Sequence, residues 1–543
     1  ERFYAQTTCT PARAALMTGQ YAWRHGFTEL GPIGTGDVDC LGRLYVDDDS
    51  DAATSAFIDL PAPLTLGDPA NRGLLSDRLS SLGYATHLVG KWHLGASALD
   101  CYPEHRGFDA HFGLLGGAHD HFGHFDGAQC AGADPRWPCV VAPALDGYDL
   151  RDASSTSSAA VPYALAGLPA SPSADGFSSN LFGARAAEVV AAHDATTSPL
   201  FLLFAPTAPH VPLQADPQDL DAAACADAFP DAATDPQRWV CALMRGLDRA
   251  VDVLVDALET ATMWPDTILL FASDNGAPAA FSNAPLRGTK LEYYDGALRV
   301  PAFFAGGRVP HKTLAPTAFV DMTDVLPTLL GAAGAADAAS GTDGRDLSAQ
   351  LFVPNDDDAD LATTLTPPRD IVLTTERDVN VSIPVLGVDF LFRTGGLIAH
   401  VNGTVYKYVI TPQRPLGEPV RGEVAELYAL IDDPYETTNL VDDEPAVAAV
   451  LKAKLATYTT QQTYGFKSGP RNIVTAPPGL AYAPYNNCWL GLDDPGRDDA
   501  TLSCAGLLPA RTPIPDLPGF GIGIQCVGNR TVAYRAEVDC AAA

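Results

Sequence analysis

The sequence is short of positive charge. Its 543 residues include 34 lysines and arginines against 66 aspartates and glutamates, a formal net charge of −32 at pH 7. Because phosphate groups are bound through a basic face, this balance argues against a nucleic-acid-binding protein and equally disfavours docking on an anionic membrane. A run of apolar residues long enough to cross a bilayer is also missing. The longest, from Pro199 to Pro209, fits a buried strand.

Cysteine pairs of the CxxC type, which would indicate a zinc site, are absent. Instead, 11 cysteines are spread along the chain, and sequons begin at Asn380, Asn402 and Asn529. Together these features favour a secreted or lumenal glycoprotein with disulfide bonds, and the odd cysteine count leaves one thiol over. No signal peptide is visible, but the chain opens at Glu1 with sequence typical of the middle of a domain, so we expect the natural N-terminus upstream.

Helical and extended patterns alternate between residues 73 and 306. Apolar residues at helical spacing predict helices over Leu74–Leu82, Phe182–Val190 and Val240–Leu258. Apolar runs predict strands over Ala85–Gly90, Leu200–Ala205, Thr267–Ser273 and Val300–Ala305. Unbroken apolar strands separated by helices predict an α/β fold whose mostly parallel sheet is covered on both faces. In such sheets ligands bind beyond the carboxyl ends of the strands.

Two changes in composition divide the chain. The stretch 355–368 is rich in Asp, Thr and Pro and predicts a boundary, and the stretch from Pro470 is rich in Gly and Pro and holds four cysteines. Between them, a strand signal over Thr404–Ile410 and a helical pattern over Ala446–Tyr458 predict a smaller α+β domain. We therefore predict a large domain over 1–365, a small α+β domain over 366–469, and an irregular, disulfide-tied tail over 470–543.

The segment Cys9-Thr10-Pro11-Ala12-Arg13 opens a predicted helix that Gly19 closes. Pro11 suits a first helical position and Gly19 a C-cap, so Cys9 lies at a helix N-terminus, where backbone N–H groups favour an anion. A lone cysteine is more often a half-cystine or a buried thiol. Here the odd cysteine count makes Cys9 a natural candidate for the unpaired one.

Three polar residues follow the ends of two predicted strands. Lys91 and His93 stand two apart in Gly-Lys-Trp-His-Leu-Gly, so an extended chain points both side chains to one side. His210 follows the strand over 200–205 in Ala-Pro-His-Val-Pro. Taken singly, Lys91 and His93 are better explained as a solvated lysine and a hydrogen-bonded histidine. His210 alone is a weak signal, which its place at the carboxyl end of a strand strengthens.

Asp274, Asn275 and Gly276 end the strand over 267–273. Asn-Gly is typical of a tight hairpin, but the residues after Gly276 do not read as a returning strand. A carboxylate beside an amide carbonyl suits a hard cation such as calcium. Lys290, in Leu-Arg-Gly-Thr-Lys, could belong to a surface charge cluster, but lysine is scarce in this acidic chain.

The order of these motifs resembles the type I, formylglycine-dependent sulfatases. Cys-x-Pro-x-Arg is similar to the signature in which the cysteine is oxidised to formylglycine, and Gly-Lys-Trp-His-Leu-Gly to the second signature. The segments near 84–109 and 177–208 look most like the arylsulfatase B, or N-acetylgalactosamine-4-sulfatase, branch. Three departures are mild: Ala12 replaces the usual Ser, Asp295 replaces Glu, and one extra residue precedes Arg299. A further pattern around Glu426-Leu427-Tyr428 extends the resemblance to about Leu440.

The resemblance implies an alkaline-phosphatase-like fold, hydrolysis of sulfate esters, and a role for each matching residue. Cys9 would be the formylglycine precursor, Arg13 would support it, and Lys91 and Lys290 would contact the aldehyde hydrate and the sulfate. His93 would act as a base in sulfate expulsion, and His210 would help to protonate the leaving oxygen. One calcium ion would be held by Asp274, Asn275 and the modified Cys9. The implied partners are a sulfated small molecule or carbohydrate and the formylglycine-generating enzyme.

Two alternatives stay open. A phosphatase or phosphodiesterase of the same superfamily would use Ser or Thr as nucleophile, which the Cys9 motif speaks against. A sulfatase-like binding protein would keep Cys9 unmodified or lack a complete metal site. A histidine-rich segment could touch a sugar or aryl group, although surface solvation explains it equally well; its members are His119, Asp120, His121 and His124.

Two further expectations concern the covalent frame and the N-terminal region. Short loops favour the disulfides Cys130–Cys139 and Cys225–Cys241, the resemblance favours Cys40–Cys101, and the four tail cysteines are expected to pair among themselves. In the family, adjacent aspartates at the end of a first strand complete the metal site, and only eight residues precede Cys9. We therefore expect residues 1–543 to lack one central strand and half the metal site, to bind calcium weakly and to show little activity, with a longer version recovering both.

Overall fold

The protein is described by a computed structural model over residues 2–25, 73–95, 101–119, 121–124, 149–153, 176–230, 236–278, 281–310, 318–352, 370–383, 388–413 and 422–459. Elsewhere only the strand backbones 43–46, 56–59, 161–162, 480–483, 488–491, 523–527 and 530–534 are described. The expectations for the boundary at 355–368, the tail, Asp120, Cys40, Cys130 and Cys139 therefore lie outside the described residues. No described helix has the length and apolar character that crossing a membrane requires.

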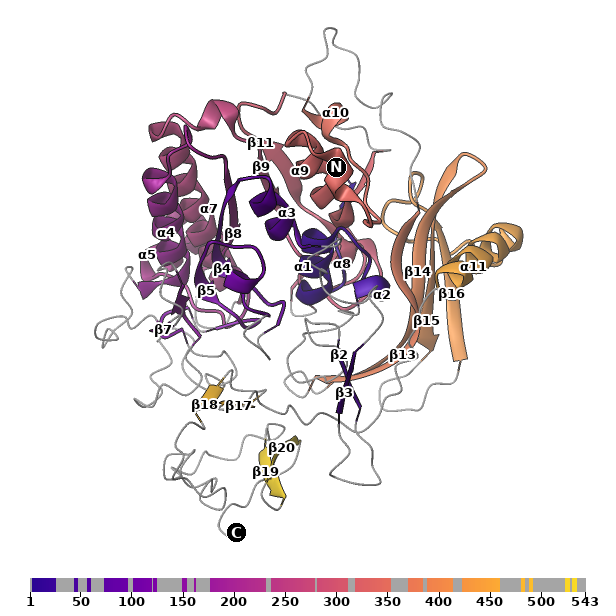
Figure 1. Ribbon diagram of the computed structural model, residues 1–543. Helices are drawn as coiled ribbons and strands as arrows, with labels where there is room; N and C mark the ends of the chain where they lie inside the picture. The colour runs from indigo at the N-terminus through magenta and orange to yellow at the C-terminus, as the bar shows by residue number, and fades with distance from the viewer. Residues whose placement is uncertain are drawn as a thin grey trace.

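The largest sheet of the N-terminal part has the order β7-β6-β5-β4-β8 (Figure 1). Its parallel centre consists of β4 (Ala85–Lys91), β5 (Ala110–Leu114) and β8 (Leu200–Ala205). The strands β6 (Arg151–Asp152) and β7 (Val161–Pro162) add an antiparallel edge. The predicted strands over 85–90 and 200–205 are thus confirmed as parallel neighbours.

Helices cover both faces of this sheet because successive residues of an apolar strand point to opposite sides. From β8, Leu202 and Phe204 pack toward α4 (Ser178–Ala192) and α7 (Pro236–Thr260). Phe201 and Leu203 pack on the other side, toward α3 (Leu75–Ser81) and α1 (Cys9–Thr18). The three predicted helices are therefore confirmed as α3, α4 and α7.

A second group of strands lies on the far side of β8. Here β9 (Leu269–Ala272) pairs antiparallel with β11 (Ala302–Ala305), and β1 (Arg2–Tyr4) lies between β10 (Arg299–Val300) and β12 (Phe319–Asp321). The single strand predicted over 300–305 is wrong in detail. It divides at Pro301 into strands of two different sheets, since proline has no N–H to offer a ladder.

The two sheets do not meet. Between β8 and β9 lies a cavity of about 2480 Å³, lined by apolar residues from both strands and from the helices above and below. All of β9, and β8 up to Phe204, is only half-buried, so the expectation of fully buried strands is wrong for these two. The helices α8 (Asp295–Leu298) and α9 (Val325–Ala332) complete this part of the fold.

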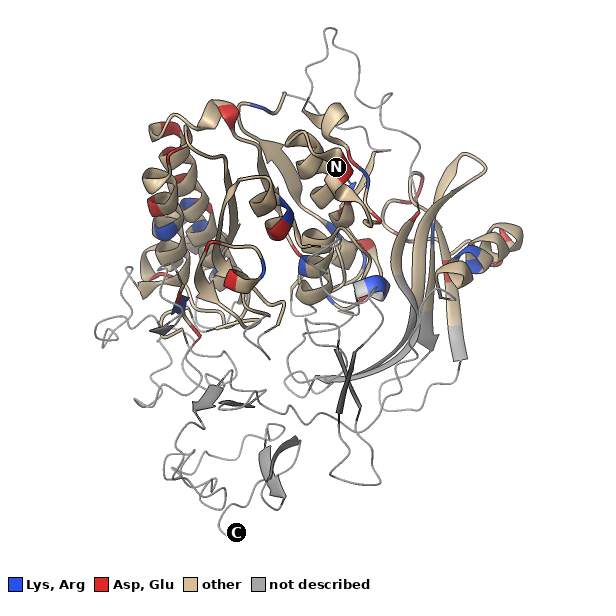
Figure 2. Ribbon diagram, in the orientation of Figure 1, with Lys and Arg blue, Asp and Glu red and all other residues tan. Residues whose placement is uncertain are grey.

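The C-terminal part is a four-stranded antiparallel sheet in the order β13-β14-β15-β16, with α11 (Pro445–Thr459) packed against it. Its strands are β13 (Ile371–Ile383), β14 (Val388–Val401), β15 (Thr404–Gln413) and β16 (Gly422–Ala429). Tyr4 and Tyr294 share a hydrophobic core with Ile371 and Tyr428, so this sheet packs directly on the N-terminal part. Figure 2 shows the charged residues mainly on helices and loops, with the central strands of the N-terminal part free of them.

Candidate active site

The helix α1 places Cys9 in its first turn. Thr8 is the N-cap, and Gly19 ends the helix in the left-handed region with φ 64°, its N–H donating to the Ala15 carbonyl. Pro11 is the third residue of the helix rather than the first, which is still a position where no N–H partner is lost. Cys9 is buried and carries a free thiol, as the odd cysteine count predicts.

Four basic residues from three separate segments converge on that thiol. The Lys290 ammonium lies 3.6 Å from Cys9 Sγ, and Lys91, His93 and His210 also act on it. Burial alone raises the pKa of the Cys9 thiol, but the charges of Lys91 and Lys290 and hydrogen bonds from His210 and His93 outweigh burial, so the pKa falls well below its usual value. The pocket therefore stabilises negative charge at this position.

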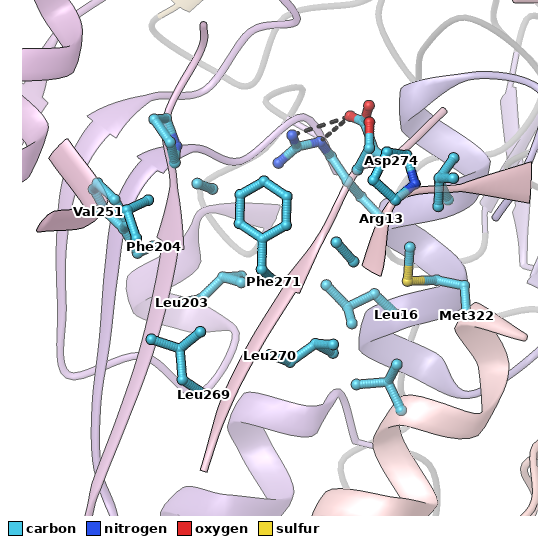
Figure 3. Close-up of a pocket in the computed structure, with 18 of the residues that line it drawn as sticks. Arg13, Leu16, Leu203, Phe204, Val251, Leu269, Leu270, Phe271, Asp274 and Met322 are labelled. Atoms are coloured by element: carbon cyan, nitrogen blue, oxygen red, sulfur yellow. Dashed lines mark hydrogen bonds and ion pairs between the residues drawn. The ribbon is translucent and has the colours of Figure 1, made fainter. Parts of the chain in front are cut away.

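Arg13 fastens the helix to two strand ends. Its guanidinium donates to Asp274 Oδ2 at 3.2 and 3.1 Å and to the Lys91 carbonyl at 3.0 Å. Burial raises the pKa of the Asp274 carboxyl, but the positive charges of Arg13, Lys91 and Lys290 together outweigh burial, so the pKa is below its ordinary value. Figure 3 shows this ion pair at one end of the apolar cavity.

Lys91 and His93 reach the site by different backbone conformations. The strand β4 ends at Lys91, and His93 has a left-handed φ of 61°, so the extended geometry expected for this pair stops at Lys91. Tight packing holds the His93 ring, because a Cβ at Gly117 would come within 2.7 Å of its Nε2. Burial lowers the pKa of Lys91 to about 8 and that of His93 to about 4, which keeps the imidazole neutral.

The loop after β8 carries His210 and is braced by His121, a residue to which the sequence assigned no such role. The His121 ring contacts the His210 carbonyl at 3.0 Å through Nε2 and Thr207 Oγ1 at 3.4 Å through Nδ1. Its backbone N–H donates to Gln214 Oε1 at 2.7 Å. The only sequence signal was the cluster of histidines, which does not reveal the partner.

The neighbouring histidines are equally buried. His119 and His124 are fully enclosed against Phe182 and Ser178, with the two imidazole rings 5.1 Å apart. Burial lowers the pKa of His119 well below its usual value and that of His124 to about 3. The expectation that this segment is surface-solvated, or touches a sugar, is therefore wrong for His119, His121 and His124.

The polar groups that could hold a metal are partly present. Asn275 Oδ1 is buried without a hydrogen-bond partner, and the Asp274 carboxylate precedes it in the loop after β9, so both groups suit a hard cation. Calcium takes about six to eight oxygens. Within the part of the chain that the structure describes, no group of three His, Cys, Asp or Glu side chains could hold a metal ion. The donor chemistry fits calcium, while the number of donors among these residues does not.

Among the described residues, one expected disulfide is confirmed, while the expected Cys40–Cys101 pair stays a prediction. Cys225 and Cys241 are bonded, with their Cα atoms 5.7 Å apart. Cys101 is also disulfide-bonded, and its partner lies outside the described residues.

Comparison of the sequence with models of protein families identifies the family to which the chain belongs. The sulfatase family model matches residues 1–335, and the chain belongs to this family. The alkaline-phosphatase-like α/β fold expected from the motifs is confirmed by the structural neighbours.

Among curated relatives, mouse arylsulfatase J is 30% identical over 350 residues, which cover 64% of this chain and 48% of that protein. Rat arylsulfatase G is 28% identical over 376 residues, covering 64% of this chain and 60% of that protein. The chain thus spans about half to three fifths of the length of these relatives.

Solved structures share the fold at lower identity. The crystal structure of Ps i-CgsB superposes with a TM-score of 0.57 at 20% identity and covers 86% of each chain. The structure of BT4656 in complex with its substrate D-glucosamine-2-N,6-O-disulfate has a TM-score of 0.50 at 14% identity, covering 85% of this chain and 90% of that one.

Proposed function

We propose that the protein hydrolyses sulfate esters with a formylglycine made from Cys9. The observation that carries the proposal is the free, buried thiol of Cys9 at a helix N-terminus, 3.6 Å from the Lys290 ammonium and beside Lys91. Two neighbouring lysines would not stabilise a neutral, purely structural thiol. A hydrated aldehyde attacking a sulfate needs such a cationic surround, because negative charge grows on the sulfate oxygens as the ester breaks.

When present, formylglycine would add water to form a hydrate with two hydroxyls on one carbon, one of which could attack sulfur while the other later helps to release sulfate. The neutral His93 accepts a proton in the expulsion, in keeping with its pKa of about 4. Lys91 and Lys290 hold sulfate oxygens, and His210 delivers a proton to the leaving oxygen. Through its ion pair with Asp274, Arg13 holds the helix that carries Cys9 next to the loop after β9.

Asp274 and the unpartnered Asn275 carbonyl would hold a calcium ion, together with the modified Cys9. The ion would supply positive charge facing the sulfate. Its remaining ligands would come from groups other than the described side chains.

The substrate class we propose is a sulfated carbohydrate or aryl alcohol. The glucosamine disulfate bound by the structural neighbour supports a sulfated sugar, and the arylsulfatase relatives support an aryl ester. We further propose a secreted or lumenal glycoprotein that meets the formylglycine-generating enzyme in the same compartment. In support, Asn402 is exposed at the tip of the β14–β15 hairpin, and the disulfides suit an oxidising compartment.

Co-expression with the formylglycine-generating enzyme tests this proposal. Mass spectrometry of the Cys9 peptide should show the aldehyde. The purified protein should release 4-methylumbelliferone faster from 4-methylumbelliferyl sulfate than from 4-methylumbelliferyl phosphate. Cys9→Ala is the matched control and should be inactive on both. A peptide that carries only thiol or disulfide would exclude the formylglycine mechanism, and faster phosphate cleavage would favour the phosphatase alternative.

A further inference from the structure

The positive charge of the cavity that reaches the candidate site is concentrated around Cys9. The described cationic residues of its lining are Arg2, Arg13, Lys91, Lys290, Arg299 and Arg308. Of these, Lys91 and Lys290 both act on the Cys9 thiol, and the Lys290 ammonium lies 3.6 Å from it. The two lysines therefore offer their charge at one place, where a single sulfate group would be held.

The arginines of this lining are already bound by groups of the protein. Three of them form ion pairs with carboxylates at 3.1 to 3.9 Å, namely Arg13–Asp274 (Figure 3), Arg299–Asp295 and Arg308–Asp266. Arg2 is buried and donates to the Leu430 carbonyl at 2.9 Å. Within the described lining, a second anionic group on a substrate would thus meet only cations that carboxylates or a carbonyl already engage.

The loop that carries Lys290 also brings a carboxylate to the cavity. Glu292 belongs to the lining, and its Oε2 accepts hydrogen bonds from the Thr289 N–H at 2.7 Å and from Thr289 Oγ1 at 3.2 Å. Both donors are neutral, so they leave the negative charge of Glu292 in place. A second anionic group near this loop would be repelled.

The side from which a leaving group would depart is apolar. Val211 directly follows His210, lines the cavity and is 48% exposed. His210 Nδ1 lies 2.8 Å from the Val211 carbonyl. Because a carbonyl only accepts, Nδ1 carries a hydrogen, and Nε2 is the nitrogen that remains to serve the leaving oxygen. A leaving group at His210 Nε2 would therefore lie close to the segment that carries Val211.

Met244 adds a second apolar side chain from the helix on which this loop packs. Ala208 and Ala215 share a hydrophobic core with Leu243 of α7, which fixes the loop against the helix. Met244 is 43% exposed and lines the same cavity. Covering exposed apolar surface gains about 25 cal/mol per Å². An apolar leaving group would obtain this gain, whereas a charged one would lose hydration without a free cation to replace it.

We propose that Val211 and Met244 form a leaving-group subsite that selects sulfate esters whose only anionic group is the sulfate. The substrate class is the sulfate ester of an uncharged alcohol with an apolar face, and polyanionic sulfated saccharides are disfavoured. The inference rests on the proposed sulfatase function for the place of the leaving group. Its selectivity comes from apolar contact for one class of ester and an unpaired charge for the other.

Two matched esters test the proposal: 4-(sulfooxy)phenylacetamide and 4-(sulfooxy)phenylacetate. They differ by one negative charge, and the methylene group keeps the acidity of the two phenols nearly equal. Calorimetry on the full-length Cys9→Ala protein should show at least tenfold tighter binding of the amide. Salt at about 0.15 M limits the reach of the overall charge to about 8 Å. The kcat/KM values of the formylglycine-containing protein should follow the same order.

Two lysine variants locate the selectivity. Val211→Lys supplies a cation at the subsite and should reduce the preference for the amide at least fivefold. Val450→Lys, at a valine of α11 that is 52% exposed and outside the cavity lining, makes the same change of net charge and should leave the preference unchanged. Circular dichroism confirms that each variant is folded.

Equal binding of the two esters, or no detectable binding of either, would overturn the proposal. An equal effect of Val450→Lys would assign the preference to the overall charge and refute the role of Val211. Preferential binding of the amide without hydrolysis of either ester by the formylglycine-containing protein would refute the proposed reaction and support the subsite.

Discussion

Cys9 differs from an ordinary buried thiol because of the side chains that face it. Burial by itself raises the pKa of the thiol, whereas Lys91, Lys290, His210 and His93 lower it and outweigh burial. On the proposed mechanism, the same positive charges that lower the pKa of the thiol would also stabilise a sulfate ester under attack.

Lys290→Ala and His210→Ala should each lower the kcat/KM for a sulfate ester by about a hundredfold or more. Each removes a charge or a proton donor that acts on the reacting group. The exposed residues Lys452 and His105 provide matched controls, and their alanine variants should keep full activity. Steady-state kinetics on the formylglycine-containing protein measures both, and unchanged rates in the first two variants would place the site elsewhere.

In protein made without the modifying enzyme, the pKa of the Cys9 thiol should lie well below that of an ordinary cysteine. Lys91→Met should raise its pKa, because the largest favourable charge would be lost while burial remains. The carbon-13 shift of the Cys9 Cβ, followed against pH, reports this titration. A Cys9 that titrates as an ordinary thiol in the parent protein would contradict the electrostatic account.

At the scale of elements, the site depends on loops and sheet contacts that lie behind it. His121 joins the start of α4 to the His210 loop, because its backbone carbonyl accepts the Ser178 N–H at 2.8 Å while its ring contacts the His210 carbonyl. On the other side, Lys407 from β15 lies fully buried between Asp295 of α8 and Glu436, at 2.6 and 2.7 Å. Asp295, which stands where glutamate is usual, also accepts a hydrogen bond from Tyr4 Oη at 3.1 Å.

His121→Phe should lower kcat about tenfold or more while changing KM little. It removes the ring contact to the His210 carbonyl and leaves that loop less well positioned, and one buried hydrogen bond of this kind is worth about 1–3 kcal/mol. His121→Gln, which can still donate, should recover part of the loss. Equal losses in both variants, together with a lowered melting temperature, would mean that His121 serves stability alone.

Lys407→Met should lower the free energy of unfolding by about 3–5 kcal/mol, because it leaves two buried carboxylates without their cation. Burial lowers the pKa of Lys407, but Asp295 and Glu436 raise it more, in keeping with a charged lysine. Urea denaturation measures the change, with the exposed Lys452→Met as control. Adding Glu436→Gln should recover part of the stability, and additive losses would argue against a coupled triad.

At the scale of the whole molecule, buried neutral histidines make stability depend on pH. Burial lowers the pKa of His93, His111 and His121 to about 4 and that of His124 to about 3, with His119 also well below its usual value. These rings take up protons in the unfolded chain below about pH 6.5 but not in the folded one. Stability is therefore fully present above about pH 6.5 and is lost as the pH falls toward 4.

The midpoint of urea unfolding should accordingly fall steeply between pH 6.5 and 4. Each extra proton bound by the unfolded state contributes about 1.4 kcal/mol per pH unit. His124→Phe removes one such group and should flatten the dependence, whereas His105→Phe, at an exposed histidine, should leave it unchanged. A midpoint independent of pH across this range would contradict the buried, neutral assignment.

The sequence alone indicated the family and the residues that gather around Cys9 through its motifs, and it located α3, α4, α7, β4, β8 and β9 through local spacing. Periodicity of 3.6 or 2 residues, a glycine that tolerates positive φ, and polar residues after apolar strands are all properties of neighbours in the chain. The domain boundaries and the roles of the site residues remain predictions.

Only the tertiary structure decided which residues meet across long separations. No sequence pattern indicates that His121 contacts the His210 carbonyl, or that Lys407 lies between Asp295 and Glu436. The cavity between β8 and β9 likewise depends on segments that are far apart in the sequence. A buried histidine and a solvated one look alike in sequence, and a strand edge is defined by the neighbour it has or lacks. Burial and pairing are properties of the packed molecule, and they set both the pKa values of this site and the space left beside it.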